Sequence, residues 1–273
     1  MSAPVSTPHG SYPRLTLGTA TFDAANPAII TPLMGSGRNQ ILGQAASIRA
    51  HPDFSSISVV EWRVDFYDKY AQPAKVTAVY EKLIEFFGEV PVLATLRTSA
   101  EGGQADVSDQ TYVQILTALA TTPGAVILDI ETARGTAVEA LEQAQAHDVA
   151  TLGSYHDIDH TPTSFDILER LQTMGYRGYD LAKIAVMPNS PADVIRIYEA
   201  TYQASSVLTQ PVISVAMGPL GVGSRLSGGI FGSAATFATL QGASAPGQVP
   251  VRLVVEAGQA VYTSAKNSKD ETP

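Results

Sequence analysis

Eight short apolar segments, each suited to a buried β-strand, alternate along this chain with longer segments of helical periodicity. They lie at 28–34, 56–65, 90–97, 125–131, 149–156, 179–186, 211–217 and 229–237. Most stretches between them can hold a crossover helix: apolar residues recur at helical spacing in 73–88, and 164–175 ends at a glycine. Apolar strands separated by helices indicate a parallel sheet covered by helices.

Eight such units in 273 residues predict an α/β fold, a single-domain (β/α)8 TIM barrel over residues 14–263. An open doubly wound sheet that binds a dinucleotide would need a glycine fingerprint after the first strand, and LMGSGRNQ does not supply it. Residues 1–13 and 264–273 are polar, and we expect flexible tails there. The glycine- and alanine-rich segment at about 238–249 is expected to be a mobile lid loop.

Charge and composition argue against several classes of function. The 17 basic and 26 acidic residues give a net charge of −9, whereas binding to nucleic acid or to a membrane surface needs a basic field. Cysteine is absent, so disulfides and thiolate metal sites are excluded. The start, MSAPVSTPHG, is unlike a signal peptide, and no apolar run is long enough to span a membrane. We therefore expect a soluble cytoplasmic protein, in which a local group of arginines can still bind a small anion.

Ionisable residues gather near the C-terminal ends of the predicted strands, where barrels of this kind place their chemistry. They are Glu61, Arg63, Asp65, Arg97, Glu101, Asp129, Glu131, His156, Asp157 and Lys183. Each one alone has an ordinary structural explanation, such as an ion pair between neighbouring strands. Together they would form one ring around one mouth of the barrel, and this predicts an active site.

Lys183 interrupts the apolar segment YDLAKIAV, where an ammonium is costly to bury unless it is paired or loses its proton. In a barrel interior that also holds Arg63, Arg97 and Arg225, desolvation and neighbouring positive charge would lower the pKa of this amine. A neutral amine can form a Schiff base with a carbonyl, and the iminium then makes a neighbouring C–H acidic. The alternative is a structural salt bridge between Lys183 and a carboxylate on a neighbouring strand.

His156 is the histidine placed at a predicted strand end, so it is the candidate base for that proton, with Glu101 as the group that orients it. The loop DIDHTPT places His160 where it could face a substrate, without further support. A metal site is not predicted, because HExxH is absent and His156 and His160 have no evident reason to converge.

Six segments, in order along the chain, resemble the type I 3-dehydroquinate dehydratases of the shikimate pathway. They are VVEWRVDFYD, ATLRTSAEGGQ, GSYHDIDHTPT, AKIAVMP, SVAMGPLGVGSRLSGGIFGSAATFA and ASAPGQVPV. The resemblance runs from about residue 29 to 251, nearly the whole folded chain. It implies a (β/α)8 barrel, often homodimeric, that needs no metal or cofactor and converts 3-dehydroquinate to 3-dehydroshikimate by syn elimination of water.

The resemblance also implies a role for each matching side chain. Lys183 matches the lysine that forms an imine with the substrate ketone, and His156 matches the histidine that removes the adjacent proton and then protonates the departing hydroxyl. Glu101 matches the carboxylate bonded to that histidine, and Arg225 matches the arginine that pairs with the substrate carboxylate. The other matches are the lid residues Ser244 and Gln248, the hydroxyl-contacting wall of Glu61, Arg63 and Arg97, and the apolar contacts Met217 and Phe237.

One position departs from the family pattern, because Pro32 in the first predicted strand stands where many relatives carry a serine that lines the site. A proline offers no hydroxyl, so recognition of the ring hydroxyls is expected to differ slightly.

Three alternatives stay open at this point. A class I aldolase or transaldolase-like enzyme would share the barrel and the imine. A barrel that binds a shikimate-type ligand without turnover would be expected to lack the lysine or the histidine. Quinate breakdown would use the same dehydration in a catabolic direction.

Overall fold

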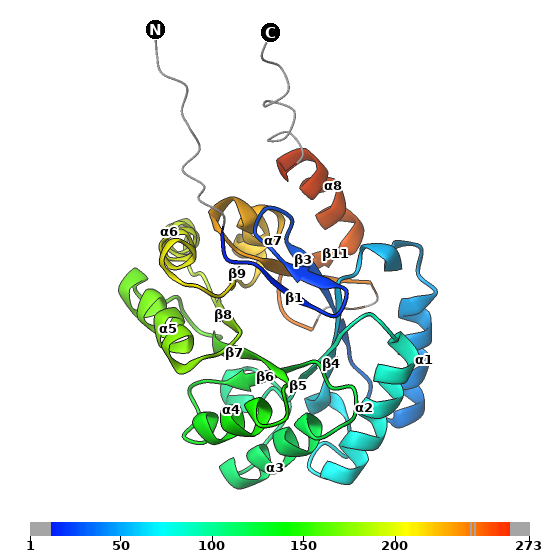
Figure 1. Ribbon diagram of the computed structural model, residues 1–273. Coiled ribbons are helices and arrows are strands. Elements are labelled where there is room, and N and C mark those ends of the chain that lie inside the picture. The colour runs from blue at the N-terminus through cyan, green and yellow to red at the C-terminus, as the bar shows by residue number, and fades with distance from the viewer. Residues whose placement is uncertain (1–11, 241, 243, 263–273) are drawn as a thin grey trace, which may run out of the picture.

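The computed structural model describes residues 12–240, 242 and 244–262, and eight parallel strands within them curve into a barrel (Figure 1). The strands are β3 (Ala28–Leu33), β4 (Val59–Arg63), β5 (Val92–Thr95), β6 (Ile127–Glu131), β7 (Ala150–Asp157), β8 (Leu181–Val186), β9 (Val212–Ala216) and β10 (Ala235–Thr239). Neighbours in chain order pair in parallel from β3 to β9, and β10 pairs with β3. The predicted fold class is confirmed.

The ring closes between β9 and β10 through a few contacts near their N-terminal ends. The amide of Ala234 donates to the carbonyl of Val212 at 2.7 Å, and the amide of Ser214 donates to Ser233 Oγ at 3.2 Å. A two-residue strand, β11 (Val249–Pro250), pairs with the end of β10 on the side away from β3. The connection between β10 and β11 is therefore tethered to the barrel at both of its ends.

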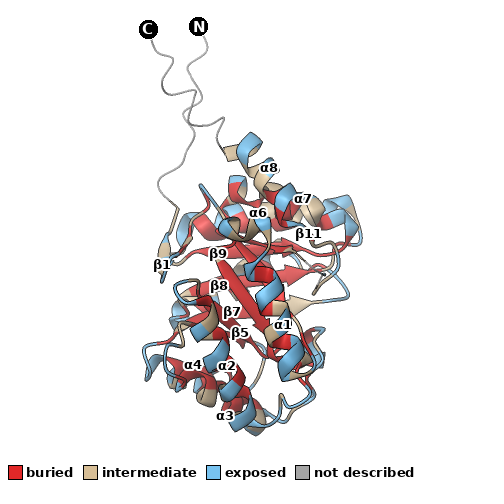
Figure 2. Ribbon diagram, turned by 90° about the vertical axis from the view of Figure 1, so that its right-hand side faces the viewer, coloured by how far each residue is buried: buried red, intermediate tan, exposed pale blue. Residues whose placement is uncertain are grey.

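Helices cover the outside of the barrel, as Figure 2 shows by their exposed outer faces and buried inner ones. They are α1 (Arg38–Arg49), α2 (Pro73–Phe87), α3 (Asp109–Ala120), α4 (Ala137–Gln145), α5 (Ser164–Arg177), α6 (Pro191–Val207), α7 (Val222–Ser227) and α8 (Val251–Tyr262). Local sequence fixes their ends: Thr163 and Asp166 form a capping box at the start of α5, and Gly178 ends it with a φ of 86°. Within the described residues, every helix is too short or too polar to span a membrane.

A short antiparallel hairpin closes the N-terminal end of the barrel. Its strands are β1 (Leu15–Leu17) and β2 (Ala20–Phe22), and Phe22 packs with the apolar residues of the barrel interior. Thr19 Oγ1 donates to the carbonyl of Glu89 at 2.9 Å, which ties the hairpin turn to the segment before β5. The strands that form this plug were not among the eight predicted.

Alternation along each strand sends one set of side chains into the barrel and the other set toward the helices. On β8, Leu181 and Ala185 belong to the inner apolar cluster, whereas Ala182 and Ile184 belong to the cluster between sheet and helices. Lys183 shares the parity of Leu181 and therefore points into the barrel.

The eighth strand differs from its prediction at 229–237. Residues Gly228–Phe231 form a 3-10 turn instead, and the strand begins at Ala235. Gly232 has a φ of 100°, and a Cβ on Gly229 would meet the carbonyl of Ala24 at 2.5 Å, so these glycines build a tight turn. Three more 3-10 turns that bear on the site are η2 (Val64–Phe66), η3 (Ser99–Glu101) and η4 (Pro219–Gly221).

The structure describes only part of the predicted tails and lid. Residues 1–11 and 263–273 lie outside the described residues, as do lid positions 241 and 243. In the predicted lid range, 238–239 belong to β10 and 249 to β11, and the described residues between them form no helix.

Candidate active site

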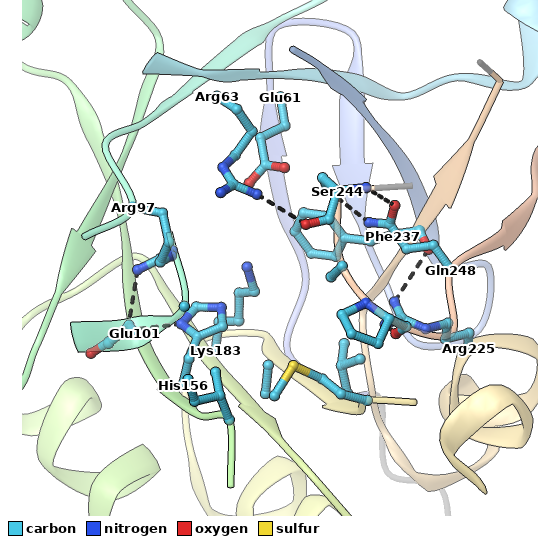
Figure 3. A pocket seen from close by; sticks show the side chains of 17 residues that line it. Glu61, Arg63, Arg97, Glu101, His156, Lys183, Arg225, Phe237, Ser244 and Gln248 are labelled. Atoms are coloured by element: carbon cyan, nitrogen blue, oxygen red, sulfur yellow. Dashed lines mark hydrogen bonds and ion pairs between the residues drawn. The ribbon is translucent and has the colours of Figure 1, made fainter. Parts of the chain in front are cut away.

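A cavity of about 630 Å³, measured with its open mouth, lies at the C-terminal ends of the barrel strands. Every side chain that was given a role in the site lines it: Glu61, Arg63, Arg97, Glu101, His156, Lys183, Met217, Arg225, Phe237, Ser244 and Gln248. The other members of the predicted ring, Asp65, Asp129, Glu131 and Asp157, are not among the residues that line it. In Figure 3, Lys183 stands between a group with Glu101 and His156 on one side and a group with Arg225 and Ser244 on the other. The barrel thus brings side chains from distant parts of the sequence around one amine.

Lys183 is 5% exposed, and its Nζ lies 4.1 Å from the centroid of the Phe237 ring. None of the ion pairs among the described residues includes Lys183. The structural salt bridge considered as an alternative for this lysine is therefore not formed. The amine has an aromatic face and the open cavity as its immediate surroundings.

Burial lowers the pKa of Lys183 below its ordinary value of 10.5. The largest effects of neighbouring charge come from Asp129 and Glu61, which raise this pKa, while Arg97 and Arg63 lower it. The sequence led us to expect that desolvation and neighbouring arginines would both lower this pKa; the two carboxylates that oppose them were not expected. The net result still favours the neutral amine that attack on a carbonyl requires.

His156 ends the inward face of β7, with its Nδ1 2.8 Å from Glu101 Oε2. Burial, followed by the positive charges of Arg97 and Lys183, lowers the pKa of His156 well below its ordinary value. The ring is therefore neutral at neutral pH and ready to accept a proton. Because Nδ1 faces Glu101, Nε2 is the nitrogen left for a substrate.

Glu101 is held by the 3-10 turn η3 and is 5% exposed. Burial raises the pKa of this carboxyl to about 8, against the opposing effect of Arg97, whose Nη1 donates to Oε2 at 3.2 Å. Its other oxygen, Oε1, has no hydrogen-bond partner among the described residues. One oxygen of Glu101 thus serves both the histidine and the arginine.

Arg97 joins three carboxylates inside the barrel. Its Nη1 donates to Glu131 Oε1 at 3.1 Å as well as to Glu101, and its Nη2 donates to Asp129 Oδ1 at 2.7 Å. Burial by itself would lower the pKa of Arg97, but these carboxylates outweigh it and raise the pKa well above its ordinary value. Ser154 Oγ accepts a further bond from Nη1 at 3.1 Å. Arg97 is therefore a permanent positive charge fixed between β6 and η3.

Glu131 fixes the turn that carries Glu101. Its Oε1 accepts from the amide of Thr98 and its Oε2 accepts from Thr98 Oγ1, both at 2.7 Å. Thr98 is the residue immediately before η3. The position of Glu101 against the histidine thus depends on a carboxylate of the neighbouring strand.

The lid loop is bound to the barrel by two arginines. Arg63 forms a bidentate pair with Asp65 at 2.8 and 2.7 Å, and its Nη1 donates to the carbonyl of Ser244 at 3.4 Å. Ser244 and Gln248 bond to each other, through Ser244 N to Gln248 Oε1 at 2.8 Å and Gln248 Nε2 to Ser244 Oγ at 3.0 Å. This segment of the predicted lid is therefore a folded turn above the cavity.

Arg225, from α7, is 4% exposed and donates to the carbonyl of Pro246 at 3.1 Å and to that of Phe237 at 3.4 Å. Among the described residues no carboxylate pairs with it, and its Nε has no partner. Burial lowers the pKa of Arg225 to about 10, which leaves it charged at neutral pH. A buried guanidinium without a counter-charge is suited to bind an anionic ligand group.

His160 lies away from this centre. Its Nδ1 is 3.1 Å from Asp157 Oδ1, and two thirds of its side chain is exposed. Within the described residues, no group of three His, Asp or Glu side chains is placed to hold a metal ion.

Sequence reasoning gave no role to several polar side chains that point into the barrel around the site. Asp129 and Glu131 were seen as strand-end carboxylates but received no role, and Ser154 and Thr95 were not considered. All four side chains point into the barrel, and along each strand they alternate with apolar side chains that face the helices. That alternation was the signal available in the sequence. Pro32 is not among the residues that line the cavity.

Comparison with known proteins identifies the family of this chain. The sequence pattern of the family "Type I 3-dehydroquinase" matches residues 29–265. The chain belongs to the type I 3-dehydroquinase family. Among its relatives, the 3-dehydroquinate dehydratase of Listeria welshimeri is 38% identical over 240 residues, covering 87% of this chain and 94% of the relative. That of Bacillus subtilis is 37% identical over 241 residues, covering 87% and 92%.

Solved structures of type I 3-dehydroquinases share the barrel. The Clostridium difficile enzyme, described with covalently modified comenic acid, superposes with a TM-score of 0.86 at 30% identity and covers 93% of this chain and 99% of its own. The Geobacillus kaustophilus 3-dehydroquinate dehydratase gives a TM-score of 0.86 at 32% identity, covering 93% and 98%. The resemblance read from the six sequence segments is confirmed.

Proposed function

We propose that this protein is a lyase that converts 3-dehydroquinate to 3-dehydroshikimate and water through a Schiff base on Lys183. The observation that carries the proposal is the pairing of a buried amine of lowered pKa with a neutral histidine in one cavity. Family membership supplies the substrate class, and the structure supplies groups suited to each step.

The proposed reaction begins when the neutral amine of Lys183 adds to the ketone and water leaves to form an iminium. The iminium withdraws electrons from the adjacent carbon, and His156 Nε2 removes a proton from it. The electron pair expels the hydroxyl on the next carbon, which takes the proton from His156 and departs as water from the same face. A second water then hydrolyses the imine and frees the lysine. Glu101 balances the imidazolium that exists between the two proton transfers.

Substrate binding is assigned to the rest of the cavity. Arg225 is proposed to hold the substrate carboxylate, because it is buried and charged with no carboxylate partner among the described residues. The lid residues Ser244 and Gln248 are proposed to cover it. The remaining assignments follow the family: Glu61, Arg63 and Arg97 contact the ring hydroxyls, and Met217 and Phe237 supply apolar contacts.

The first experiment is reduction with borohydride in the presence of 3-dehydroquinate, followed by mass spectrometry of the peptides. An adduct on the peptide that contains Lys183, together with 3-dehydroshikimate absorbance in the unreduced sample, is the expected result. Lys183→Ala serves as the matched control and should give neither adduct nor product. Product without an adduct in the parent protein would contradict the imine route. Sugar phosphates, the substrates expected of an aldolase, should give no turnover.

The metabolic direction and the cellular setting are part of the proposal. We assign the reaction to the biosynthesis of aromatic amino acids in the cytoplasm, and neighbouring genes together with cell fractionation test this against quinate breakdown. No cofactor is assigned to the reaction, because the lysine, the histidine and the carboxylate supply its chemistry.

We also propose a homodimer that buries exposed apolar residues of two adjacent helices. Phe165 and Tyr176 on α5 are 72% and 87% exposed, and Ile195 on α6 is 67% exposed. The helices α5 and α6 pack against each other, and an exposed apolar surface is a candidate interaction surface. Sedimentation of the parent and of Phe165→Glu tests this proposal, since a change from dimer to monomer is expected only if this face is the interface.

A further inference from the structure

The barrel interior around Lys183 is polar on five consecutive strands. Glu61 on β4 accepts from Thr95 Oγ1 on β5 at 3.0 Å, and Asp129 on β6 accepts from Ser154 Oγ on β7 at 2.8 Å. Lys183 completes the series on β8, in register with Ser154. Two hydrogen-bonded carboxylate–hydroxyl pairs therefore lie on the inner wall that also carries the lysine, and the pair of Asp129 and Ser154 is the nearer one in strand order.

Asp129 is the more unusual of the two carboxylates. It is fully buried, and its Oδ1 accepts from both Arg97 Nη2 at 2.7 Å and Ser154 Oγ at 2.8 Å. Its Oδ2 has no hydrogen-bond partner among the described residues. A buried, unpartnered carboxylate oxygen costs folding free energy and calls for a functional explanation.

The charge of Lys183 changes during the reaction, and a nearby carboxylate such as Asp129 can stabilise the positively charged state. The amine that attacks the ketone must be neutral, whereas the iminium formed with the substrate carries a full positive charge in the same buried position. A fixed negative charge aimed at the place where positive charge develops stabilises that state without reorganisation. Ser154, which donates to Asp129, is in register with Lys183 on the neighbouring strand, so this carboxylate lies on the same stretch of the inner wall as the amine, and its charge raises the pKa of Lys183.

We propose that Asp129 is a positioning residue whose buried carboxylate, held in place by Ser154 and Arg97, is the counter-charge for the iminium on Lys183. The proposal rests on the imine reaction proposed above. The charge of Glu61 also raises the pKa of Lys183, with a smaller effect than that of Asp129. The other charged or titratable groups that act on or respond to Lys183 are Arg63, Arg97, Glu101 and His156.

Asp129→Asn keeps the shape of the side chain and removes its charge, and it should move two measurements in opposite directions. Without the carboxylate, the pKa of Lys183 falls further, so the free amine is present at lower pH. The midpoint of its titration should fall by about one pH unit, the lower end of what a neighbouring opposite charge produces. The iminium loses its counter-charge, so the fraction of Lys183 trapped by borohydride at equilibrium should fall by about tenfold.

The amine titration is measured by competitive acetylation with acetic anhydride over a range of pH, with mass spectrometry of the Lys183 peptide. Lys82, half of whose side chain is exposed on α2, is the internal standard for reagent strength. Both measurements use the full chain with 3-dehydroquinate added only for the trapping. A distorted site would lower acetylation and trapping together, whereas the counter-charge model raises acetylation at low pH while trapping falls.

Glu131→Gln is the matched control variant, because it removes a carboxylate from the same strand and from the same arginine. Both oxygens of Glu131 are already bonded to Thr98, so its charge does not face the lysine in the way proposed for Asp129. Its Lys183 midpoint should move clearly less than that of Asp129→Asn. If Asp129→Asn fails to fold, Ser154→Ala takes its place and should produce a smaller shift of the same sign.

Each outcome decides between the proposals. A parent protein that traps substrate on Lys183, with an unchanged or raised midpoint in Asp129→Asn, overturns the counter-charge role and leaves the imine reaction intact. Trapping that is unchanged in the variant overturns it equally. A parent that traps nothing overturns the proposed function instead, and that result is seen before any variant is made.

Discussion

Replacing Glu101 by glutamine tests how the base is supported. In the parent, Glu101 Oε2 faces both His156 Nδ1 and Arg97 Nη1, at 2.8 and 3.2 Å. The amide oxygen of a glutamine can occupy the same position and accept the same two bonds. The variant therefore keeps the geometry and removes only the negative charge that balances the imidazolium during proton transfer.

The size of the effect follows from that one charge. A hydrogen bond to a charged group contributes about 1.5–3 kcal/mol, against about 1 kcal/mol for a neutral one. If the charge matters only while His156 is protonated, kcat should fall by roughly tenfold to 100-fold with little change in KM. Stopped-flow or steady-state measurement of the product absorbance gives both constants. Imine trapping on Lys183 should persist in this variant.

The pH dependence gives a second test of the same substitution. Burial raises the pKa of Glu101 to about 8, so its carboxylate becomes available to the histidine only as the pH rises through that value. In the parent, this ionisation should contribute an increase in kcat around that pH, and Glu101→Gln should lose it. The variant should keep any increase that comes from the deprotonation of Lys183.

The ionisation of Glu101 should raise kcat as the pH increases, but it should lower the stability of the folded protein. The pKa of Glu101 is higher in the folded state than the ordinary value of 4.5, so its contribution to stability is fully present below that value and is lost as the pH rises through about 8. The parent should therefore lose stability relative to Glu101→Gln as the pH rises. The difference in free energy of unfolding between the two proteins should change by on the order of a few kcal/mol from pH 5 to pH 9, in favour of the variant. Urea unfolding at the two pH values measures the difference.

A matched control is Asp157→Asn, which removes a carboxylate one residue from His156 that is paired instead with the exposed His160. Its kcat and pH profile should stay close to those of the parent. A Glu101→Gln variant with the kcat and pH profile of the parent would refute the reasoning, because the carboxylate charge would then not support the base.

Three further outcomes are expected. His156→Ala should lose several orders of magnitude in kcat and still form the borohydride-trapped adduct on Lys183; near-normal turnover would mean that another group is the base. Arg225→Lys should raise KM by about tenfold or more and change kcat less, because a lysine replaces a bidentate partner by a single charge, as initial-rate kinetics will show. Gly247→Ala should lower kcat/KM with a small change in Tm, since Gly247 has a φ of 76° and a Cβ there would meet the carbonyl of Gly218 at 2.2 Å, displacing the lid.

Much of the barrel could be predicted because its strands are buried on both faces and separated by helical segments. Seven of the eight predicted segments contain a parallel strand whose bounds differ by a few residues at most. The eighth segment overlaps its strand only at 235–237. GGIFGS looks apolar, yet its glycines form a turn that packs against neighbouring backbone. The hairpin before β3 was missed, although LTLGTATF carries a signal for it. Gly18 and Thr19 separate two short alternating runs, and Gly18 adopts a φ of 56°, as a tight hairpin turn requires.

The sequence was enough to predict which residues line the candidate site, but not how their charges pair and set the pKa of Lys183. Lys183 was identified because it broke an apolar strand, and His156 because it stood at a strand end. The sequence does not show that Arg97 is shared among Asp129, Glu131 and Glu101, because those bonds depend on barrel curvature and on the η3 turn. Nor does it show that carboxylates oppose the arginines in setting the pKa of Lys183. Such balances arise from distances across the barrel, which strand periodicity does not encode.

The interior of the barrel changes character around its circumference, and this constrains how a ring-shaped substrate can lie. From β4 to β7 the inward side chains beyond the first apolar layer are Glu61, Arg63, Thr95, Arg97, Asp129, Glu131, Ser154 and His156. Strand β8 supplies Lys183 and Ala185, whereas β9 and β10 supply Val215, Met217 and Phe237. In the reaction proposed above, the ring hydroxyls face the polar arc and the bare carbons face Met217 and Phe237. We then expect the substrate carboxylate to meet Arg225 and the ketone to lie over Lys183. This proposed orientation would present the proton next to the imine to His156.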